Sequence, residues 1–585
     1  MTERIAALRG ALRQQGMDGF ILPVNDEFMG EYVPDSAKRL EWLTGFSGSA
    51  GLAIVLQDKA AFFTDGRYTL QAETQVKGFE LYNSGDMPPE KWLAAQAGAE
   101  SIIGYDARLH TKQAIKRYET ACSKLVWKAL QSNPVDVLWQ GRPAAPASKA
   151  RIQPLAYTGQ TSQQKREMIA AALKEKGADS AVLTAPDSIC WLLNLRGSDV
   201  PFTPFLLCYA VIDAKGVVDF YIASDRLSQE VLAHLGDGVR VKPPQQLEQD
   251  IAALKGKRVL YDPAASPIWF YQQLASAGAH IVEFSDPCHL PKACKNEAEL
   301  EGMRQAHIRD GLAVTRFLHW LEQAVASGEA LTEIAVAQKL EAFRKQSELY
   351  LEPSFSTISG SGPNGAIVHY HATESSNRAL DKDSLLLVDS GGQYLDGTTD
   401  ITRTVALGTP SAQMKADFTR VLKGHIALAS AVFPEGTSGG QLDVLARQYL
   451  WQAGLDYDHG TGHGVGSYLS VHEGPQRIGK RGGDAPLVPG MVVSNEPGFY
   501  KANAYGIRIE SLVAVRQVMV GENGKAYLGF ETITLAPLDM RLVDTALLTL
   551  QEVEWLHSYH RRVYETHERH LNDAEKAWLK RFAAL

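Results

Sequence analysis

The first 290 residues alternate between amphipathic helical stretches and short apolar runs, and this alternation occurs twice. In residues 4–22 a helical pattern ends at Gly16, and Asp18 precedes a strand-like apolar run. Residues 165–183 repeat this order, with Gly177 and Asp179 at the corresponding positions. Two further similar pairs follow in the same sequence, 41–48 with 190–197 and 62–67 with 221–226. The pattern predicts two copies of one α/β unit.

The second half of the chain has a different character. A Pro- and Ala-rich stretch, residues 141–155, predicts a linker between the two copies, and a second boundary falls near residues 285–311. There Asn296 is a candidate N-cap for a long amphipathic helix. Beyond it, short apolar runs are separated by segments rich in Gly, His, Asp and Glu. The last 35 residues have a helical pattern, and their histidines are expected on a solvated or subunit-facing surface.

Three aspartates lie between Val388 and Val405 in a segment rich in glycine and threonine. An apolar run ends in Asp389, and a β-branched run contains Asp400, so a hairpin would set the two roughly opposite each other. Directly opposed residues have Cβ atoms only ~4.5–5.5 Å apart, which is unfavourable for two carboxylates unless a cation lies between them. A divalent metal ion is the natural candidate. Asp396, followed by glycine, is expected to serve the turn.

Residues 458–475 contain three histidines, His459, His463 and His472, among closely spaced glycines. The first two have helical spacing, but the glycines make a helix improbable. Glycine instead lets the backbone pass close to a substrate or metal. A single histidine here would be read as a surface or core residue, whereas three near so many acids favour a metal site.

Two glutamates and one more histidine end or interrupt apolar runs: Glu496, Glu510 and His369. Arg508 shares a face with Glu510 in an alternating strand pattern, so an ion pair between them is the alternative to a metal site. Four acids and one histidine are enough for two divalent ions that share carboxylates. Because oxygen ligands dominate, Mn(II) is expected first, with Zn(II) or Co(II) as alternatives.

Composition narrows the function classes. The net charge is −8, the isoelectric point is about 6.1, and no long basic run is present, which argues against a nucleic-acid partner. We expect no membrane association, because no apolar stretch approaches the ~18–20 residues of a span and the N-terminus lacks a signal-peptide pattern. Five unpaired-looking cysteines are typical of reduced thiols, so a cytoplasmic location is expected.

Taken together, these motifs resemble the dinuclear "pita-bread" metallopeptidases, and among them the three-domain Xaa-Pro aminopeptidases (aminopeptidase P). The resemblance extends over essentially the whole chain and rests on PSFSTISGSGPNGAIVHY, DSGGQYLDGTTDITRT, HGTGHGVG, SVHEGP and NEPGFY…GIRIE. It implies an α/β (α+β) fold. The implied parts are two creatinase-type domains, 1–150 and 151–292, a pita-bread catalytic domain, 293–538, and a helical C-terminal extension, 539–585.

The resemblance also implies residue roles. Five residues match the metal ligands: Asp389, Asp400, His463, Glu496 and Glu510. Of these, Asp400 and Glu510 match the ligands that bridge both ions. Four more match the residues that surround the substrate or orient the carboxylates: His369, His459, His472 and Arg508. Glu496 is in addition expected to pass a proton to the leaving nitrogen, and His472 to stabilise the oxyanion.

The implied activity is hydrolysis of the N-terminal Xaa-Pro bond of peptides with proline in second place, by a hydroxide shared between two metal ions. Prolidase, which is restricted to dipeptides, shares the ligand set but resembles a shorter, two-domain chain. Methionine aminopeptidase lacks such N-terminal domains, and non-catalytic peptide-binding relatives lose the ligands that this chain keeps. The resemblance further implies a homodimer.

Overall fold

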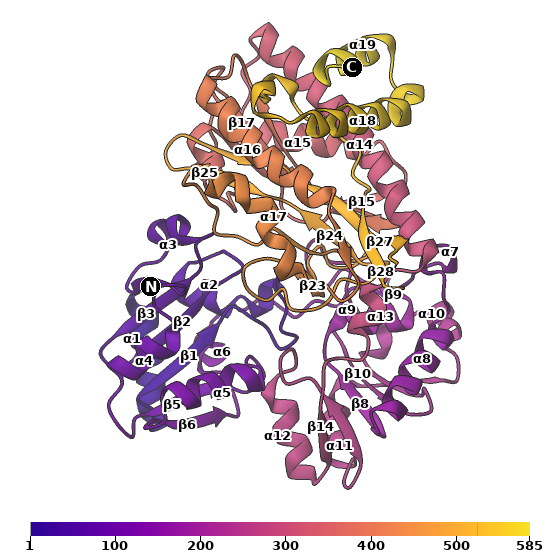
Figure 1. Cartoon of the computed structure of the whole chain (residues 1–585). Helices are drawn as coiled ribbons and strands as arrows, with labels where there is room; N and C mark the ends of the chain where they lie inside the picture. Colours follow the sequence, from indigo (N-terminus) through magenta and orange to yellow (C-terminus); the bar gives the residue numbers. More distant parts are fainter. Residues whose placement is uncertain (1, 523) are drawn as a thin grey trace. The chain divides into compact units, whose positions relative to one another are not determined.

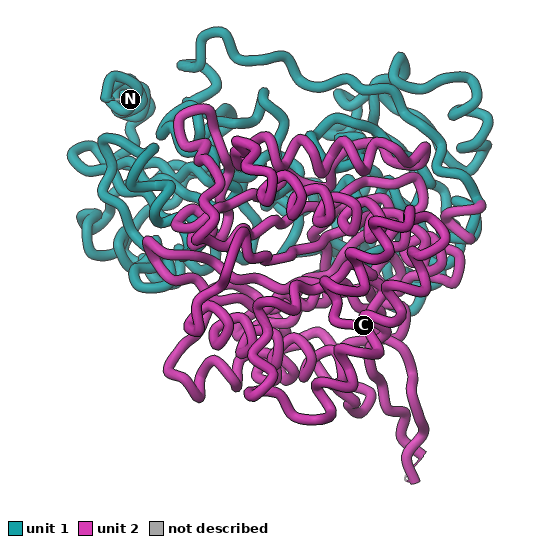
Figure 2. Tube along the Cα trace, turned by 90° about the horizontal axis from the view of Figure 1, so that it is seen from above, with its two compact units in different colours: residues 1–155, 160–289 teal, residues 156–159, 290–585 magenta. Residues whose placement is uncertain are grey.

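The computed structural model describes residues 2–522 and 524–585 (Figure 1). The chain forms two compact units, one made of residues 1–155 and 160–289 and the other of residues 156–159 and 290–585 (Figure 2). Each unit has its own buried apolar clusters. The mixture of helices and strands confirms the α/β class.

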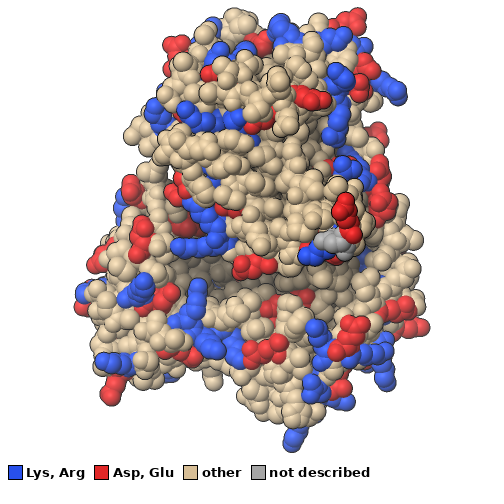
Figure 3. All heavy atoms as spheres, viewed as in Figure 1, with Lys and Arg blue, Asp and Glu red and all other residues tan. Residues whose placement is uncertain are grey.

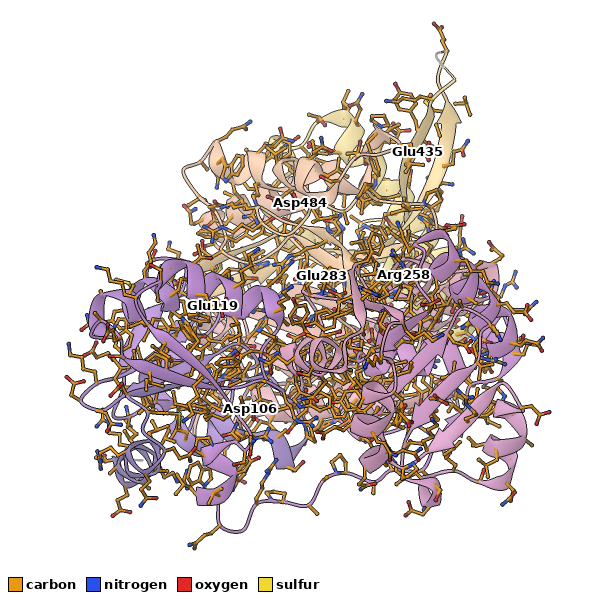
Figure 4. All side chains as sticks on the ribbon, turned by 90° about the horizontal axis from the view of Figure 1, so that it is seen from below. Asp106, Glu119, Arg258, Glu283, Glu435 and Asp484 are labelled. Atoms are coloured by element: carbon orange, nitrogen blue, oxygen red, sulfur yellow. The ribbon has the colours of Figure 1, made fainter. Side chains whose placement is uncertain are left out.

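The first unit contains two six-stranded sheets. One has the order β4-β3-β2-β1-β5-β6 and is built from β1 (Gly19–Pro23), β2 (Leu52–Leu56), β3 (Ala60–Thr64), β4 (Glu80–Asn83), β5 (Ile102–Asp106) and β6 (Val126–Leu130). The other has the order β12-β11-β10-β8-β13-β14 and is built from β8 (Ser180–Leu183), β10 (Tyr209–Asp213), β11 (Val218–Tyr221), β12 (Val239–Lys242), β13 (Arg258–Tyr261) and β14 (His280–Glu283). Figure 4 labels Asp106 at the end of β5 and Glu283 at the end of β14.

The two sheets share one topology. Each sheet has two antiparallel pairings at its centre. They are β1–β2 and β2–β3 in the first sheet, and β8–β10 and β10–β11 in the second. In both, the outer pairings and the pairing beside the first strand are parallel. This correspondence of six strands in order is what a duplicated α/β unit predicts.

Helices connect these strands. In the first copy they are α1 (Thr2–Gln14), α2 (Arg39–Thr44), α3 (Thr69–Gln75), α4 (Pro89–Gln96), α5 (Lys112–Ala121) and α6 (Pro134–Leu138). In the second they are α8 (Ser162–Glu175), α9 (Pro186–Leu193), α10 (Gln229–Leu235), α11 (Leu247–Ala252) and α12 (Ile268–Ala277). A two-stranded sheet, β7 (Arg151–Ile152) and β9 (Leu195–Arg196), lies at the start of the second copy, and α7 (Leu155–Thr158) and α13 (His289–Ala293) lie at the boundaries between the units.

The repeated Gly-x-Asp sequence has the same structural role in both copies. Gly16 and Gly177 follow α1 and α8 with φ of 65° and 62°, a left-handed conformation that glycine adopts without strain. Two residues later, the carboxylates of Asp18 and Asp179 each accept a hydrogen bond of 2.8 Å from the first backbone N–H of the neighbouring parallel strand, β5 or β13. The motif therefore ends the helix and fixes the register of the next strand.

The second unit surrounds small sheets with long helices. The helices are α14 (Glu297–Ser327), α15 (Glu333–Arg344), α16 (Ala412–Ala429), α17 (Gly439–Trp451), α18 (Leu550–His567) and α19 (Asp573–Phe582). Asn296 caps α14 in a capping box with Glu299, as the sequence predicts. Helices α18 and α19 pack against α14 (Figure 1).

The strands of this unit form three main sheets. Two are three-stranded: β15 (Tyr350–Pro353), β18 (Gly392–Tyr394) and β19 (Gly397–Thr398) form one, and β16 (Ile358–Ser361), β17 (Leu385–Ser390) and β20 (Ile401–Ala406) the other. The third has the order β21-β28-β27-β24-β22-β23 and contains β21 (Val432–Pro434), β22 (Gly462–Gly464), β23 (Glu473–Ile478), β24 (Val492–Asn495), β27 (Ser511–Val520) and β28 (Ala526–Thr532). A hairpin of β25 (Gly498–Lys501) and β26 (Tyr505–Arg508) stands beside them.

The expectation for the C-terminal histidines is wrong for two of them. His560 and His567 on α18 are fully buried rather than solvated. His560 Nε2 accepts a hydrogen bond of 3.1 Å from the backbone N–H of Leu538, and His567 Nε2 lies 2.7 Å from the carbonyl oxygen of Leu535. These contacts fix α18 to the segment that follows β28. Burial removes both imidazoles from water and lowers their pKa.

Both signs of charge are interspersed over the face shown in Figure 3. Among residues 2–522 and 524–585, no helix combines the length and the apolar character needed to cross a membrane. Helix α14 has 31 residues, but charged side chains occur along its length.

Candidate metal centre

The two aspartates lie at the ends of paired strands, with a different register from the one predicted. Asp389 in β17 pairs with Thr402 in β20, not with Asp400. A hairpin that set the two aspartates opposite each other would close around residues 393–396. The observed turn lies one position further along, because Tyr394 pairs with Gly397 and two residues close it. Asp400 is therefore a diagonal neighbour of Asp389, two residues from the paired position and on the same face.

Three further candidate residues come from the six-stranded sheet and its edge. Glu496 directly follows β24, and His463 is the middle residue of β22. Glu510 lies between β26 and β27, so the alternating strand expected to carry both Arg508 and Glu510 is interrupted, with Ile509 and Glu510 outside the two strands. Glycine allows close approach of the backbone in this region, because a Cβ on Gly462 would lie 2.0 Å from a carbonyl oxygen of β24.

The structure brings all five predicted metal residues together. In each of three sets, one atom from every residue lies within 4.8 Å of the others: Asp400, His463 and His472; His463, Glu496 and Glu510; Asp389, Asp400 and Glu510. The sets share members, so they form one continuous cluster. This is the arrangement that two ions with shared carboxylates require.

Crowding of buried carboxylates perturbs their protonation. Burial raises the pKa of Asp389 to about 6, with Arg508 opposing the shift and Asp400 adding to it. Burial, followed by the charges of Asp400 and Asp389, raises the pKa of Glu510 well above its usual range. Burial also raises the pKa of Glu496. Each shift expresses the cost of placing negative charge here without a counter-charge.

His463 responds in the opposite direction to its burial. Burial alone would lower its pKa, but hydrogen bonding to Asp400 and the charge of Glu496 outweigh this effect and raise the pKa to about 9. Its Nδ1 lies 2.9 Å from the carbonyl oxygen of Gly464, which can only accept a hydrogen bond. Nε2 therefore faces the acids, 3.4 Å from Asp400 and 3.7 Å from Glu496, in the orientation of a metal-ligating imidazole.

The donor set fits divalent metal ions. Among the residues that the structure describes, none forms a hydrogen bond with the buried Oδ1 of Asp389, although the other oxygen of this carboxylate accepts from Arg508 at 2.6 Å. Buried polar atoms are normally satisfied, and a bound cation satisfies a carboxylate oxygen. Four acids, of which Asp389 is paired with the Arg508 guanidinium, leave negative charge that two divalent ions would neutralise.

Comparison with known proteins places this cluster in a family. The model of metallopeptidase family M24 matches residues 301–517, and the model of the C-terminal region of peptidase M24 matches residues 526–584. Two models of the creatinase/prolidase N-terminal domain match residues 4–135 and 141–299.

Full-length relatives are similar throughout. A probable Xaa-Pro aminopeptidase P of Aspergillus fumigatus is 42% identical over 607 residues, covering 100% of this chain and 92% of the relative. One from Laccaria bicolor is 43% identical over 603 residues, covering 99% and 93%. The chain belongs to metallopeptidase family M24.

A solved structure agrees with this assignment. The crystal structure of X-prolyl aminopeptidase from Caenorhabditis elegans, described as a cytosolic enzyme with a di-nuclear active site, has a TM-score of 0.94 and 34% sequence identity, covering 100% of this chain and 99% of that one. The expected fold of two creatinase-type N-terminal domains and an M24 pita-bread domain is confirmed. The exact domain boundaries stay a prediction.

In this M24 site Arg508 does not form the ion pair with Glu510 that was the alternative to metal binding. Its guanidinium donates to Asp389 at 2.6 Å, to the Tyr500 hydroxyl at 2.6 Å and to the Thr402 hydroxyl at 3.2 Å. Glu510 instead accepts from the Thr402 hydroxyl at 2.8 Å. An ion pair with Arg508 therefore does not account for the burial of Glu510.

The three other predicted histidines have different surroundings. The ring of His472 lies edge-on to that of His463, with 4.3 Å between centroids. Nε2 of His459 lies 2.8 Å from the Tyr500 hydroxyl, which links it through Arg508 to Asp389. His369 is half-buried in the segment after a 3₁₀ helix (Gly362–Ala366), and its role stays a prediction.

Thr402 and Tyr500 are functional candidates in the M24 site that were not predicted from the sequence. Thr402 was detectable, because it lies two residues from Asp400 in an alternating strand and so shares its face. Tyr500 carried no comparable signal: β25 is short, and only the folded hairpin brings its hydroxyl between Arg508 and His459.

Proposed function

We propose that this chain is a metal-dependent aminopeptidase that hydrolyses the N-terminal Xaa-Pro bond of peptides. The observation that carries the proposal is the intact cluster of Asp389, Asp400, His463, Glu496 and Glu510 in a chain similar over its full length to Xaa-Pro aminopeptidases. The two ions are proposed to be Mn(II), with Zn(II) or Co(II) able to substitute. A cytoplasmic homodimer acting on peptides with proline in second place completes the proposal.

The residues of the site suggest a division of labour. When bound, the two ions supply Lewis acidity, which activates a water nucleophile and polarises the scissile carbonyl group. Glu496 accepts a proton in the first step and returns it to the proline nitrogen. The Ser494 hydroxyl, 3.2 Å from Glu496, orients that carboxylate.

Histidines complete the substrate site in this mechanism. His472, beside His463, is positioned to donate to the carbonyl oxygen as negative charge develops on it. His459 is held by Tyr500 and so is pre-oriented for the peptide beyond the scissile bond. The leaving nitrogen of proline is tertiary in the peptide, so bond cleavage depends on protonation at that atom.

The proposal is tested by comparing Arg-Pro-Pro with the dipeptide Gly-Pro as substrates of the metal-loaded protein. We expect release of free arginine from the tripeptide and little hydrolysis of the dipeptide. Preference for the dipeptide would instead identify a prolidase. Asp400→Ala and His463→Ala should abolish cleavage while the circular dichroism spectrum is retained, and full activity in either variant would refute the assignment. Sedimentation of the purified chain tests the dimer.

A further inference from the structure

A buried aspartate outside the metal cluster contacts the hairpin that carries two of the ligands. Asp310 on α14 is fully buried. Its Oδ2 accepts a hydrogen bond of 2.6 Å from the hydroxyl of Thr399, the residue immediately before Asp400. Its Oδ1 accepts one of 3.0 Å from Tyr394, at the closed end of the same hairpin. Asp310 thus holds the strand that leads into Asp400.

The partner of this aspartate reaches the other ligand strand. Arg344, at the end of α15 and almost fully buried, donates to Asp310 from Nε at 2.5 Å and from a terminal nitrogen at 3.2 Å. The same terminal nitrogen donates at 3.0 Å to the hydroxyl of Ser390, the residue immediately after Asp389. One buried ion pair is therefore bonded to the neighbours of both metal-binding aspartates.

The backbone between these two points has no room to adjust. A Cβ on Gly391 would lie 1.9 Å from the carbonyl oxygen of Thr399. That carbonyl also accepts a hydrogen bond of 2.8 Å from Ser354, and the Thr399 hydroxyl accepts one of 2.9 Å from the N–H of Gly392. The two strands are in direct contact here, so a shift of Thr399 or Ser390 is transmitted to the adjacent ligand.

We propose that the Asp310–Arg344 pair is a positioning element that sets the separation of the Asp389 and Asp400 carboxylates and thereby the affinity of the centre for metal. The pair touches neither substrate nor metal: it acts through the hydroxyls of Thr399 and Ser390. This inference rests on the proposed function only in its use of metal, not in the identity of the peptide that is cleaved.

The test is Mn²⁺ binding to the metal-free, full-length protein, measured by competition with a chromophoric chelator. Thr399→Val and Ser390→Ala remove one hydroxyl each with little change of shape, and each should weaken binding by about 10–100-fold, as is typical when a group that orients a ligand is lost. Arg344→Lys should do the same, because an ammonium cannot reproduce the forked contacts of a guanidinium. With metal at saturation, kcat on Arg-Pro-Pro should recover.

Thr419→Val is the matched control. Thr419 on α16 is also a fully buried threonine of the second unit, and its hydroxyl donates to the carbonyl of Lys415 at 2.7 Å and accepts from the N–H of Asp544 at 2.9 Å. Its loss should leave Mn²⁺ affinity unchanged. Unchanged affinity in Thr399→Val and Ser390→Ala, or an equal loss in Thr419→Val, would overturn the inference. Metal binding without Xaa-Pro cleavage would refute the proposed function and leave the positioning role intact.

Discussion

Metal binding to this centre should release protons, because the metal-free site holds them on groups that must lose them to become ligands. The perturbation is addition of Mn²⁺ to the metal-free protein at a series of pH values. The proximity of Asp400 and Glu496 raises the pKa of His463 to about 9, so near neutral pH its imidazole is protonated. A metal needs the neutral nitrogen, and binding therefore displaces this proton.

The magnitude follows from the pKa values. Below about pH 9, each unit of falling pH costs about tenfold in apparent affinity through His463 alone, or ~1.4 kcal/mol. Burial raises the pKa of Asp389 to about 6, so this carboxyl steepens the dependence further below that pH. Both groups bind protons more tightly in the metal-free site, so the sign is the same: affinity rises with pH. Glu510, with its pKa raised well above the usual range, acts in the same direction.

Isothermal titration calorimetry measures this effect directly. Titrations in buffers of equal pH and different ionisation enthalpy give the number of protons released, which near neutral pH should be at least ~1 per loaded centre. The apparent affinity should fall by at least ~100-fold between pH 8 and pH 6, because His463 alone accounts for that factor. Metal binding without proton release, or an affinity independent of pH over this interval, would refute the electrostatic description of the site.

Three other perturbations have defined outcomes. The buried carboxylate of Glu333 accepts hydrogen bonds from four groups in the segment that carries His369. Glu333→Gln should loosen this segment, so in steady-state kinetics KM for Arg-Pro-Pro should rise more than kcat falls. An unchanged KM would contradict this. Glu473→Gln leaves two buried lysines without their carboxylate and should cost ~3–5 kcal/mol in urea unfolding; a loss below ~1 kcal/mol would show that the lysines find other partners. Gly462→Ala forces a Cβ to within 2.0 Å of a β24 carbonyl oxygen and should lower Mn²⁺ affinity in the chelator assay, whereas Gly10→Ala, with open space around it, should leave that affinity unchanged. Equal effects of the two substitutions on Mn²⁺ affinity would count against close packing at the site.

Features that depend on local sequence were predictable. Gly16 and Gly177 end their helices because few other residues adopt a left-handed conformation without strain, and Asn296 caps α14 through its own side chain. The acids of the cluster were identifiable because they end or interrupt apolar or β-branched runs, and His463 because it lies among closely spaced glycines.

Features that depend on pairing between distant segments were not predictable. The register of β17 against β20 was displaced because it is set by which residues close the turn, and the pattern of apolar residues leaves that open. Asp396 does lie in the turn, but its carboxylate is also buried and paired with Arg309 on α14, which is 87 residues away in the chain. The Asp310–Arg344 pair is likewise visible only once α14 and α15 are packed together.

The most direct test of a dinuclear Xaa-Pro aminopeptidase is a titration of the metal-free protein with Mn²⁺ while release of free arginine from Arg-Pro-Pro is recorded. We predict that cleavage is absent in chelator, rises with added metal and saturates at about two ions per chain. Cleavage that persists in chelator, or metal binding at this stoichiometry with no arginine released, would contradict it.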